Sequence, residues 1–433
     1  MRHIFAALAL LSLTAPAFAE PTRAETRMAA FARGDTAHGE ALLERLVVQN
    51  SGTLNIEGVR AVGVMMRAEL EALGFVVEWV DMTETGRAGH IVATHTGNGR
   101  GKRILLIGHL DTVFETGSPF QAYSREGDRV VGPGVGDDKG GMVVIIAALR
   151  AMQAAGTLRD ADIKVVLTGD EERIGSPLAV ARRDLIAAGQ WADVALEYEG
   201  LLRDEGTDYG TIARRGSANW VLRTTGRTGH SSTIFSEGSG YGASYEMVRI
   251  LDQFRRELIE PNLTFNIGVM AGGTPAGLDA TEEVASATGK TNIIASDAVA
   301  RGDLRALTPE QHTQAIARMQ AIADANLPGT DAVLTIATGY PPMAPSDGNR
   351  ALLTRLNGVN RDLGLPEMAE VDPARRGAAD SGFVAADVDT LGGLGAAGGR
   401  AHAEGEWVDL TSIPLQAARS AVLISRLSRE PRR

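Results

Sequence analysis

Acidic and histidine side chains stand at the ends of several apolar runs in this sequence. The set comprises His109 and Asp111 after "RILLIG", Asp137 and Asp138 in "GPGVGDDKGG", Glu171 and Glu172 after "VVLTG", Glu197 and Glu199 around "ALEYEG", and His402 near the C-terminus. Taken singly, such a histidine or acidic pair is usually a solvated turn or a charge at a helix end. Taken together, they follow predicted strands, and the carboxyl ends of strands in an open α/β sheet form a ligand crevice. We therefore expect these side chains to converge on one site.

A converging set of this composition favours a metal-dependent hydrolase. Several carboxylates in one low-dielectric cleft would repel one another strongly without a cation. The chain has no Cys, and histidine nitrogen combined with carboxylate oxygen suits catalytic zinc or a similar ion. A carboxylate that bridges two such ions would hold them roughly 3.5–4 Å apart, the spacing used in two-metal hydrolysis.

The elements that must position these groups can be predicted from the hydrophobic pattern. Helical spacing extends over 40–73 and 139–156, and Gly156 is a suitable helix C-cap. Residues 75–80 are strand-like, and three further apolar runs bounded by turn residues predict strands buried on both faces. These three runs are 103–108, 162–169 and 193–198. The pattern predicts an α/β catalytic domain with a mainly parallel central sheet flanked by helices.

The pattern changes near Arg214, where an inserted domain is predicted. Alternating strand-like segments occur at 218–226, 263–272, 297–307 and 332–339, and amphipathic helices at 244–258 and 309–325. Two helices on a four-stranded sheet would form an α+β lid or dimerisation domain. We place this domain at residues 214–343, and the catalytic domain at 20–213 and 344–433.

The N-terminal segment 1–19 has the features of a secretory signal peptide. A short basic start precedes an apolar stretch and the small-residue site Ala17-Phe18-Ala19. Cleavage after Ala19 would give a secreted or periplasmic protein with no remaining membrane segment. The formal net charge of −11, without runs of Lys or Arg, argues against a nucleic-acid or anionic-lipid partner.

Five motifs, in order, resemble those of the zinc metallopeptidases that include glutamate carboxypeptidase. Dipeptidases, aminoacylases and succinyl-diaminopimelate desuccinylase are relatives in the same family. The motifs are "GHLDTV", "GVGDDKGG", "GDEERIGS", the Glu after "VALEY" and the late His before "EGEWVDL". The resemblance covers essentially the whole mature chain. It implies a hydrolase with two zinc ions per subunit, for which cobalt or manganese could substitute.

The resemblance also assigns roles to individual residues of the catalytic domain. The implied metal ligands are His109, Asp137, Glu172, Glu199 and His402. Asp137 would bridge the two ions, with a cis peptide bond to Asp138, while His109 and Glu199 would serve different ions. Glu197 is the rival of Glu199 as a ligand.

Two further catalytic roles follow from the same resemblance. Asp111 would orient the His109 imidazole, which gives the first apolar run a reason to end in this pair. Glu171 would be the general base that accepts a proton from the attacking water and passes it to the leaving nitrogen.

Three residues of the inserted domain receive implied roles. His230 in "TGRTGHSS" would stabilise the oxyanion, often from the partner subunit, so a homodimer through the lid domain is expected. Asn292 and Arg305 would hold polar groups of the substrate, and arginine suits bidentate binding of a carboxylate. The alternatives are a surface histidine and a structural ion pair between Asp303 and Arg305.

Two departures from the family pattern bear on the substrate. Ala378 and Ala379 stand in "GAAD" where Gly-Ser/Thr is usual, so a hydroxyl is missing. Tyr340 precedes Pro341 where glutamate carboxypeptidase has Arg-Pro, which argues against a strict preference for C-terminal glutamate.

The predicted function is that of an exported dizinc exopeptidase acting on a small peptide or N-acyl amino acid. It would hydrolyse a peptide or N-acyl bond next to a free C-terminal carboxylate. An N-acyl-amino-acid hydrolase or a dipeptidase on the same site is the alternative. A non-catalytic peptide- or metal-binding protein is an alternative of another class, but such a protein would have no use for the base Glu171.

Overall fold

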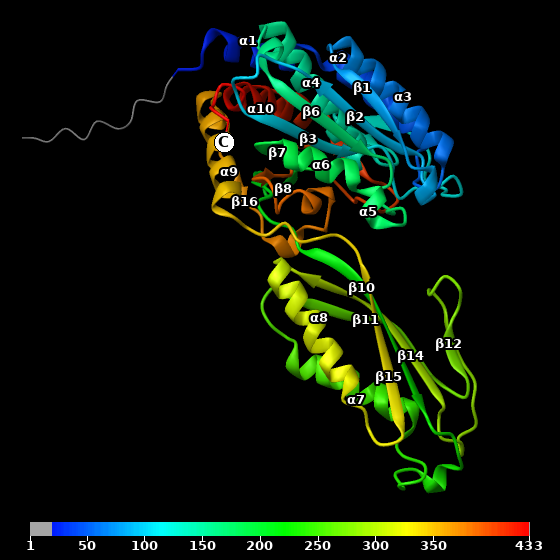
Figure 1. The fold of residues 1–433 in the computed structure, drawn as a ribbon. Helices are drawn as coiled ribbons and strands as arrows, with labels where there is room; N and C mark the ends of the chain where they lie inside the picture. The colour runs from blue at the N-terminus through cyan, green and yellow to red at the C-terminus, as the bar shows by residue number, and fades with distance from the viewer. Residues whose placement is uncertain (1–19, 433) are drawn as a thin grey trace, which may run out of the picture.

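The chain folds into two bodies, each with its own hydrophobic core (Figure 1). The computed structural model describes residues 20–432, so the predicted signal peptide lies outside the described residues. The larger body carries both ends of the described chain, and the smaller one extends from it as an elongated lobe. This arrangement confirms the expected fold class, an α/β domain with an inserted α+β domain.

The larger body is built on a six-stranded sheet in the order β1-β2-β6-β3-β7-β17. The strands are β1 (Val76–Asp81), β2 (Gly89–His95), β3 (Arg103–His109), β6 (Asp162–Thr168), β7 (Val194–Glu197) and β17 (Thr390–Leu391). β2 runs antiparallel to both of its neighbours, whereas β6, β3, β7 and β17 are parallel to one another. The sheet is therefore mainly parallel, and the segments that follow β3, β6 and β7 meet at one edge.

Helices cover both faces of this sheet. One face carries α1 (Arg23–Gly34), α2 (Thr36–Val48), α3 (Ile56–Ala72), α4 (Gly140–Ala155), α9 (Asp347–Asp362) and α10 (Ser412–Leu427), and the other carries α5 (Leu178–Ala181) and α6 (Arg183–Trp191). Side chains of β3 alternate between the two layers: Leu106 packs in the larger core and Leu105 in the smaller one. Both faces of β3 are covered, so its middle residues are all apolar or glycine.

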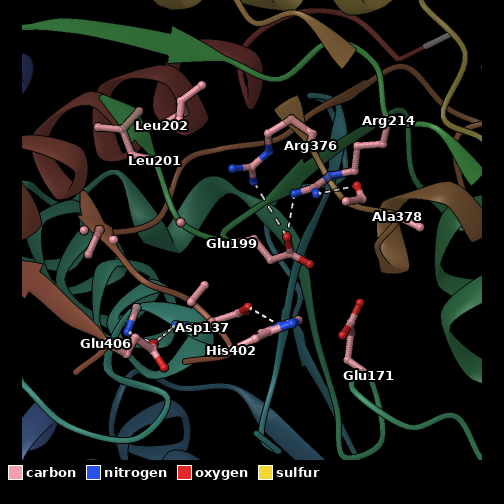
Figure 2. Close-up of a pocket in the computed structure, with 17 residues that line it drawn as sticks. Asp137, Glu171, Glu199, Leu201, Leu202, Arg214, Arg376, Ala378, His402 and Glu406 are labelled. Atoms are coloured by element: carbon pink, nitrogen blue, oxygen red, sulfur yellow. Dashed lines mark hydrogen bonds and ion pairs between the residues drawn. The ribbon is translucent and has the colours of Figure 1, made fainter. Parts of the chain in front are cut away.

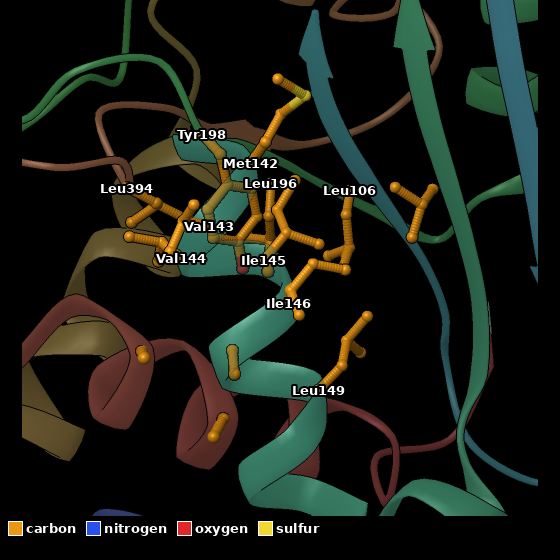
Figure 3. Packing of buried hydrophobic residues seen from close by; sticks show 14 of the residues in the cluster. Leu106, Met142, Val143, Val144, Ile145, Ile146, Leu149, Leu196, Tyr198 and Leu394 are labelled. Atoms are coloured by element: carbon orange, nitrogen blue, oxygen red, sulfur yellow. The ribbon is translucent and has the colours of Figure 1, made fainter. Parts of the chain in front are cut away.

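Helix α4 packs against the sheet, and it is buried on nearly all sides. Its residues from Met142 to Leu149 pack against Leu106 and Leu196 of the sheet (Figure 3). Its outer side packs on α1 and α10. A helix enclosed in this way has to be apolar all round. Gly156 ends it in the left-handed conformation, as predicted.

Short strands hold the loops near the sheet edge. They are β4 (Ser124–Glu126), β5 (Arg129–Val131), β8 (Leu202–Asp204), β9 (Thr207–Gly210), β16 (Ala369–Glu370), β18 (Gly398–Gly399) and β19 (Trp407–Asp409). β18 and β19 pair as an antiparallel hairpin, and β19 also pairs with β5. The loop of this hairpin carries His402. The hairpin thus brings the C-terminal histidine next to the segment that follows β5.

The smaller body is an antiparallel sheet in the order β11-β14-β10-β15, with two helices on one face. Its elements are β10 (Gly216–Gly226), α7 (Gly242–Glu257), β11 (Thr264–Gly273), the hairpin β12 (Ala276–Leu278) and β13 (Ala285–Ala287), β14 (Asp297–Ala306), α8 (Pro309–Asp324) and β15 (Thr330–Thr338). The predicted two helices on four strands are confirmed. Thr308 caps α8, and Pro309 occupies its first turn as expected.

Two chain crossings connect the bodies. Arg214 and Met343 exchange backbone hydrogen bonds of 2.9 and 3.0 Å at this hinge. The boundaries at 213/214 and 343/344 are proposals that are compatible with this pairing. Among the described residues, no helix combines the length and the apolar composition that crossing a membrane requires.

Trp220 is the central side chain of the lid core. It is fully buried, lies edge-on to Phe254 at a centroid distance of 6.2 Å, and donates its indole N–H to the Asp303 carbonyl at 3.1 Å. A Cβ on Gly302 would lie 2.4 Å from the indole, so the glycine lets β14 approach it.

We predict that Trp220→Ala lowers the free energy of unfolding of the lid domain by about 3–5 kcal/mol, because it leaves a large cavity. Val333→Ala, at an exposed position of β15, should cost less than about 1 kcal/mol. Urea denaturation followed by circular dichroism measures both changes. Equal stability losses in the two variants would contradict the central role of Trp220.

Candidate metal centre

Four of the predicted site residues lie at or just beyond the ends of neighbouring parallel strands. His109 is the last residue of β3, Glu171 and Glu172 follow β6, and Glu199 follows β7. Figure 2 shows Glu171, Glu199, Asp137 and His402 around one cavity. The predicted convergence at the sheet edge is therefore present.

Asp137 lies at the centre of this group. It belongs to the short helical segment η2 (Val135–Lys139), directly before α4. Its Oδ1 accepts a hydrogen bond from His109 Nε2 at 3.0 Å, and its Oδ2 accepts one from His402 Nε2 at 3.0 Å. The peptide bond from Asp137 to Asp138 is cis, as the resemblance implied. One carboxylate thus faces two imidazoles through its two oxygens.

Gly141 allows the start of α4 to come this close to the other strands. A Cβ on Gly141 would lie 1.9 Å from the Tyr198 carbonyl oxygen and 2.1 Å from Asp138 Oδ1. A larger residue would push the helix, and Asp137 with it, away from the strand end. This contact gives a physical reason for the second glycine in "DDKGG".

The remaining donors divide into two groups around Asp137. Donor atoms of His109, Glu171 and Glu199 lie within 4.8 Å of one another. His402 Nε2 lies 3.1 Å from Glu172 Oε2. Donor atoms of His109, Asp137 and Glu172 also lie within 4.8 Å of one another. The first group favours a shared position for His109 and Glu199, and the expectation that they serve different ions stays a prediction. His402 and Glu172 form the second position.

Glu197 and Glu199 differ in their hydrogen-bond partners. Glu197 is buried and accepts hydrogen bonds from the Arg214 guanidinium at 2.9 and 2.6 Å and from Ser381 N at 3.2 Å. Glu199 accepts one from Arg214 at 2.6 Å but also faces His109. The geometry favours Glu199 over its rival as the available donor.

Asp111 lies beneath the site and holds both the imidazole and the acidic loop. His109 Nδ1 lies 3.1 Å from the backbone carbonyl oxygen of Asp111 and 3.4 Å from its Oδ1. Asp111 Oδ1 also accepts the backbone N–H of Glu171 at 3.0 Å. Its Oδ2 accepts the backbone N–H of Glu172 at 3.1 Å and the Thr53 hydroxyl at 2.6 Å. One buried carboxylate therefore fixes the strand end and the neighbouring loop relative to each other.

The sequence analysis missed three residues of this site: Glu406, Arg214 and Arg376. Glu406 is buried, and its carboxylate accepts the backbone N–H groups of Gly134, Gly136 and Asp137 at 3.1, 2.7 and 2.9 Å. It therefore holds the loop that presents Asp137. Its position within "EGEWVDL" was the one available signal. Arg214 and Arg376 carried no comparable signal.

Burial and ion pairing shift the pKa values of the donors strongly. Hydrogen bonds to Asp137 and Glu172 raise the pKa of His402 to about 11. Burial raises the pKa of Glu199 to about 7, and burial also raises the pKa of Glu171 well above its ordinary value. Burial opposes ionisation of Asp137 too, but hydrogen bonds from the two histidines lower its pKa. The cluster thus holds more acidic groups than its own cations neutralise.

The donor set fits a pair of divalent cations. Glu172 Oε1 is buried and has no hydrogen-bond partner within residues 20–432. An ion would satisfy this oxygen and replace the protons now shared between imidazoles and carboxylates. Nitrogen and oxygen donors without thiolates are typical of catalytic zinc and related ions.

The predicted lid residues do not join this cluster within one chain. His230 and Asn292 are exposed and lie beside each other, with Ser231 N donating to the Asn292 carbonyl at 2.9 Å. They stand beyond the far end of β10, a strand of 11 residues, which places them roughly 30 Å from the hinge. Arg305 lies at the hinge end of β14 and pairs with Asp303 at 2.9 Å, the ion pair considered as an alternative.

Fold and site together define a two-domain hydrolase with a carboxylate- and histidine-rich metal centre. The model of Peptidase family M20/M25/M40 matches residues 105–426. The chain belongs to this family of metallopeptidases, which confirms the resemblance and the assignment as an enzyme.

Individual proteins are similar to this chain in sequence or in fold. Carboxypeptidase G2 of Pseudomonas sp. (strain RS-16) is 29% identical over 390 residues, which cover 89% of this chain and 88% of that protein. A tripeptidase of Staphylococcus aureus has a similar structure, with a TM-score of 0.68, 17% identity and coverage of 94% and 99% of the two chains. A dinuclear metal-binding peptidase of Bacillus subtilis has a TM-score of 0.62, 14% identity and coverage of 92% and 99%.

We predict that Arg214→Met destabilises the metal-free protein by about 3–5 kcal/mol, because the buried carboxylate of Glu197 loses its partner. Arg215→Met is the matched control. Its guanidinium donates to Thr264 Oγ1 on the lid, and its loss should cost less than about 1 kcal/mol. Chemical denaturation in the presence of a chelator measures both. If adding Glu197→Gln to Arg214→Met recovers none of the lost stability, the buried pair is not the cause.

Proposed function

We propose that the protein is a dinuclear metal exopeptidase that hydrolyses a peptide or N-acyl bond next to a free C-terminal carboxylate. The observation that carries this proposal is the convergence of five metal-type donors and one further carboxylate, Glu171, at the sheet edge. Asp137, Glu199, His402 and Glu171 line the cavity there. The similarity to carboxypeptidase G2 over most of both chains supports the carboxypeptidase type. An N-acyl-amino-acid hydrolase or dipeptidase would use the same site.

The proposed ligands form two positions that share Asp137. His109 and Glu199 would hold one ion, and Glu172 and His402 the other, with zinc the expected metal and cobalt or manganese possible substitutes. When bound, such ions polarise the scissile carbonyl and lower the pKa of a water molecule. Asp111 would keep the His109 imidazole oriented, because it lies against Nδ1 while Nε2 faces the site.

Glu171 is the proposed general base. Its backbone is held on both sides: its N–H donates to Asp111, and its carbonyl accepts the Tyr340 hydroxyl. Its side chain lines the cavity close to Glu199 (Figure 2). Burial raises the pKa of Glu171, which makes its carboxylate a stronger base. The carboxylate would accept a proton from water, and the resulting carboxyl would donate it to the leaving nitrogen.

The lid would supply the residues that bind the rest of the substrate. We assign the terminal carboxylate of the substrate to Arg305, which is at the hinge end of the lid sheet, and a polar group to Asn292. His230 would stabilise the oxyanion. Because His230 and Asn292 are remote from the cluster of their own chain, a second copy would have to bring them to it.

The lid face formed by α7 and β11 is the proposed homodimer interface. A cavity of about 490 Å³ lies between these two elements. Its lining includes Val248, Ile267 and Met270, whose exposed fractions are 57%, 44% and 56%. β11 is also an edge strand with unpaired backbone groups. Pairing of two such faces would bury these side chains.

We propose that the mature enzyme acts outside the cytoplasm, because segment 1–19 resembles a signal peptide that would be cleaved after Ala19.

We predict that Glu171→Gln lowers kcat by about 10²- to 10⁴-fold, because the amide cannot accept the proton of the attacking water. The metal content should stay near two ions per chain, since Glu171 is not a proposed ligand. Hydrolysis of dipeptides and N-acyl amino acids by the zinc-loaded protein, with elemental analysis of the same samples, measures both quantities.

Glu84→Gln changes an exposed glutamate and serves as the matched control. Chelation should remove both metal and activity from the wild type and from this control, and added zinc should restore them. Turnover by Glu171→Gln at the wild-type rate would disprove the assignment of the base. Hydrolysis confined to C-terminally blocked substrates would disprove the exopeptidase.

We predict that Met270→Arg converts a dimer into a monomer, because it places a charge in the centre of the proposed interface. Light scattering coupled to size-exclusion chromatography should give twice the mass of one chain for the wild type and the mass of one chain for the variant. Val333→Arg, on the opposite edge strand, should stay dimeric. A fully active monomeric wild type would rule out the role of the partner's lid.

A further inference from the structure

Two arginines line the cavity, and they differ in how their guanidinium groups are bonded. Arg214 donates to Glu197 and Glu199, and also to the Gly377 carbonyl at 3.0 Å. Arg376 makes no side-chain hydrogen bond to any residue between 20 and 432. Its nearest charged partner is Glu199 Oε2 at 3.7 Å, and its Nε is buried without a partner.

The Arg376 guanidinium therefore has N–H donors that are available to a ligand. The guanidinium offers five N–H groups in a planar fork, and its side chain is only 13% exposed. Burying a cation with its donors unpaired is unfavourable unless a ligand completes the site. Glu199 does not complete it, because this carboxylate already accepts a hydrogen bond from Arg214 at 2.6 Å and faces His109.

The unpaired donors face the space in which the substrate would lie. The cavity of about 370 Å³ is bordered by Arg376 as well as by Glu171 and His402. Figure 2 shows the Arg376 guanidinium above Glu199, on the side of Leu201 and Leu202. Ala378 also lines the cavity, with only a methyl group. The guanidinium fork and the proposed base therefore share one compartment.

We propose that Arg376 binds a carboxylate of the substrate other than the terminal carboxylate. This inference rests on the proposed function, in which Arg305 of the lid holds the terminal group. The substrate class is then an acidic one, with a second carboxylate on the side chain of the released amino acid or on the acyl group. A planar guanidinium binds a carboxylate through two parallel hydrogen bonds, which a neutral amide cannot reproduce.

A purely structural role is the competing explanation for Arg376. In that role it would only neutralise Glu199, and the contact of 3.7 Å is long for this purpose. Arg214 already supplies hydrogen bonds to the same carboxylate. A structural arginine would affect acidic and neutral substrates equally, which separates the two explanations experimentally.

The test compares each acidic substrate with its isosteric amide. N-acyl glutamate is paired with N-acyl glutamine, and an N-succinyl amino acid with its succinamoyl counterpart, on zinc-loaded enzyme. The wild type should prefer one acidic member by roughly 10- to 100-fold in kcat/KM, the size expected for hydrogen bonds to a charged group. Arg376→Gln should bring this ratio close to one, and Arg376→Lys should keep part of it. Loss of the preference in Arg376→Gln while Arg376→Lys retains some of it supports the proposal.

The neighbouring Arg375 provides the matched control. Its guanidinium lies at the surface and pairs with Asp204 at 3.0 Å, so Arg375→Gln should leave the ratio and the rate unchanged. Thermal unfolding shows whether each variant is folded. If Arg376→Gln does not fold, the comparison is made with Arg376→Lys, and an unaltered ratio in that variant overturns the proposal.

Binding measured without turnover separates this inference from the proposed function. Calorimetric titration of the zinc-loaded protein with glutarate and with glutaramate, its monoamide, should show tighter binding of glutarate. Arg376→Gln should remove the difference. An enzyme that hydrolyses neutral and acidic substrates equally overturns the role of Arg376 but not the exopeptidase. Selective glutarate binding without any hydrolysis supports Arg376 and refutes the exopeptidase.

Discussion

Mutual repulsion among partly buried carboxylates is the constraint on which the catalytic domain depends. Asp137, Glu172 and Glu199 converge where three parallel strands end, and burial raises the pKa of Glu172 and Glu199. Arg214 neutralises part of this charge from one side, and the two imidazoles face Asp137 from the others. The arrangement is best satisfied by cations at the centre, which is the chemistry that metallopeptidases of this family require.

Carboxylates that are not ligands hold this cluster in place through the backbone. Asp111 accepts two N–H groups of the acidic loop after β6, and Glu406 accepts three from the loop before α4. Both therefore position functional residues by fixing the main chain, and small side-chain rotations cannot release the donors. The hinge adds a further link, since Tyr340 contacts both Ser217 of the lid strand β10 and the carbonyl of Glu171. Tyr340 thereby links the lid to the loop that carries the proposed base.

The hydrophobic pattern was sufficient to predict the architecture. The runs at 103–108 and 162–169 became β3 and β6, the apolar helix at 139–156 became α4, and the change of pattern near Arg214 coincides with the start of the lid sheet. These features are local, because the period of apolar residues depends on which faces of an element are covered. The set of converging donors followed from the same reasoning, since residues after parallel strands share one edge. The resemblance to a known family added the roles of those donors.

Contacts between distant segments could not be read from such local patterns. Glu406 binds Gly136 across 270 positions of the chain, and Arg214 reaches Glu197 from the hinge. The grouping of His109 with Glu199, and the unpaired guanidinium of Arg376, likewise depend on the directions in which side chains point after folding. Residue types and their spacing along the chain therefore specify which elements form and which donors approach one another. Which charges pair and which stay free for a ligand depends on distances across the assembled site, because electrostatic and hydrogen-bond energies change steeply over an ångström or less.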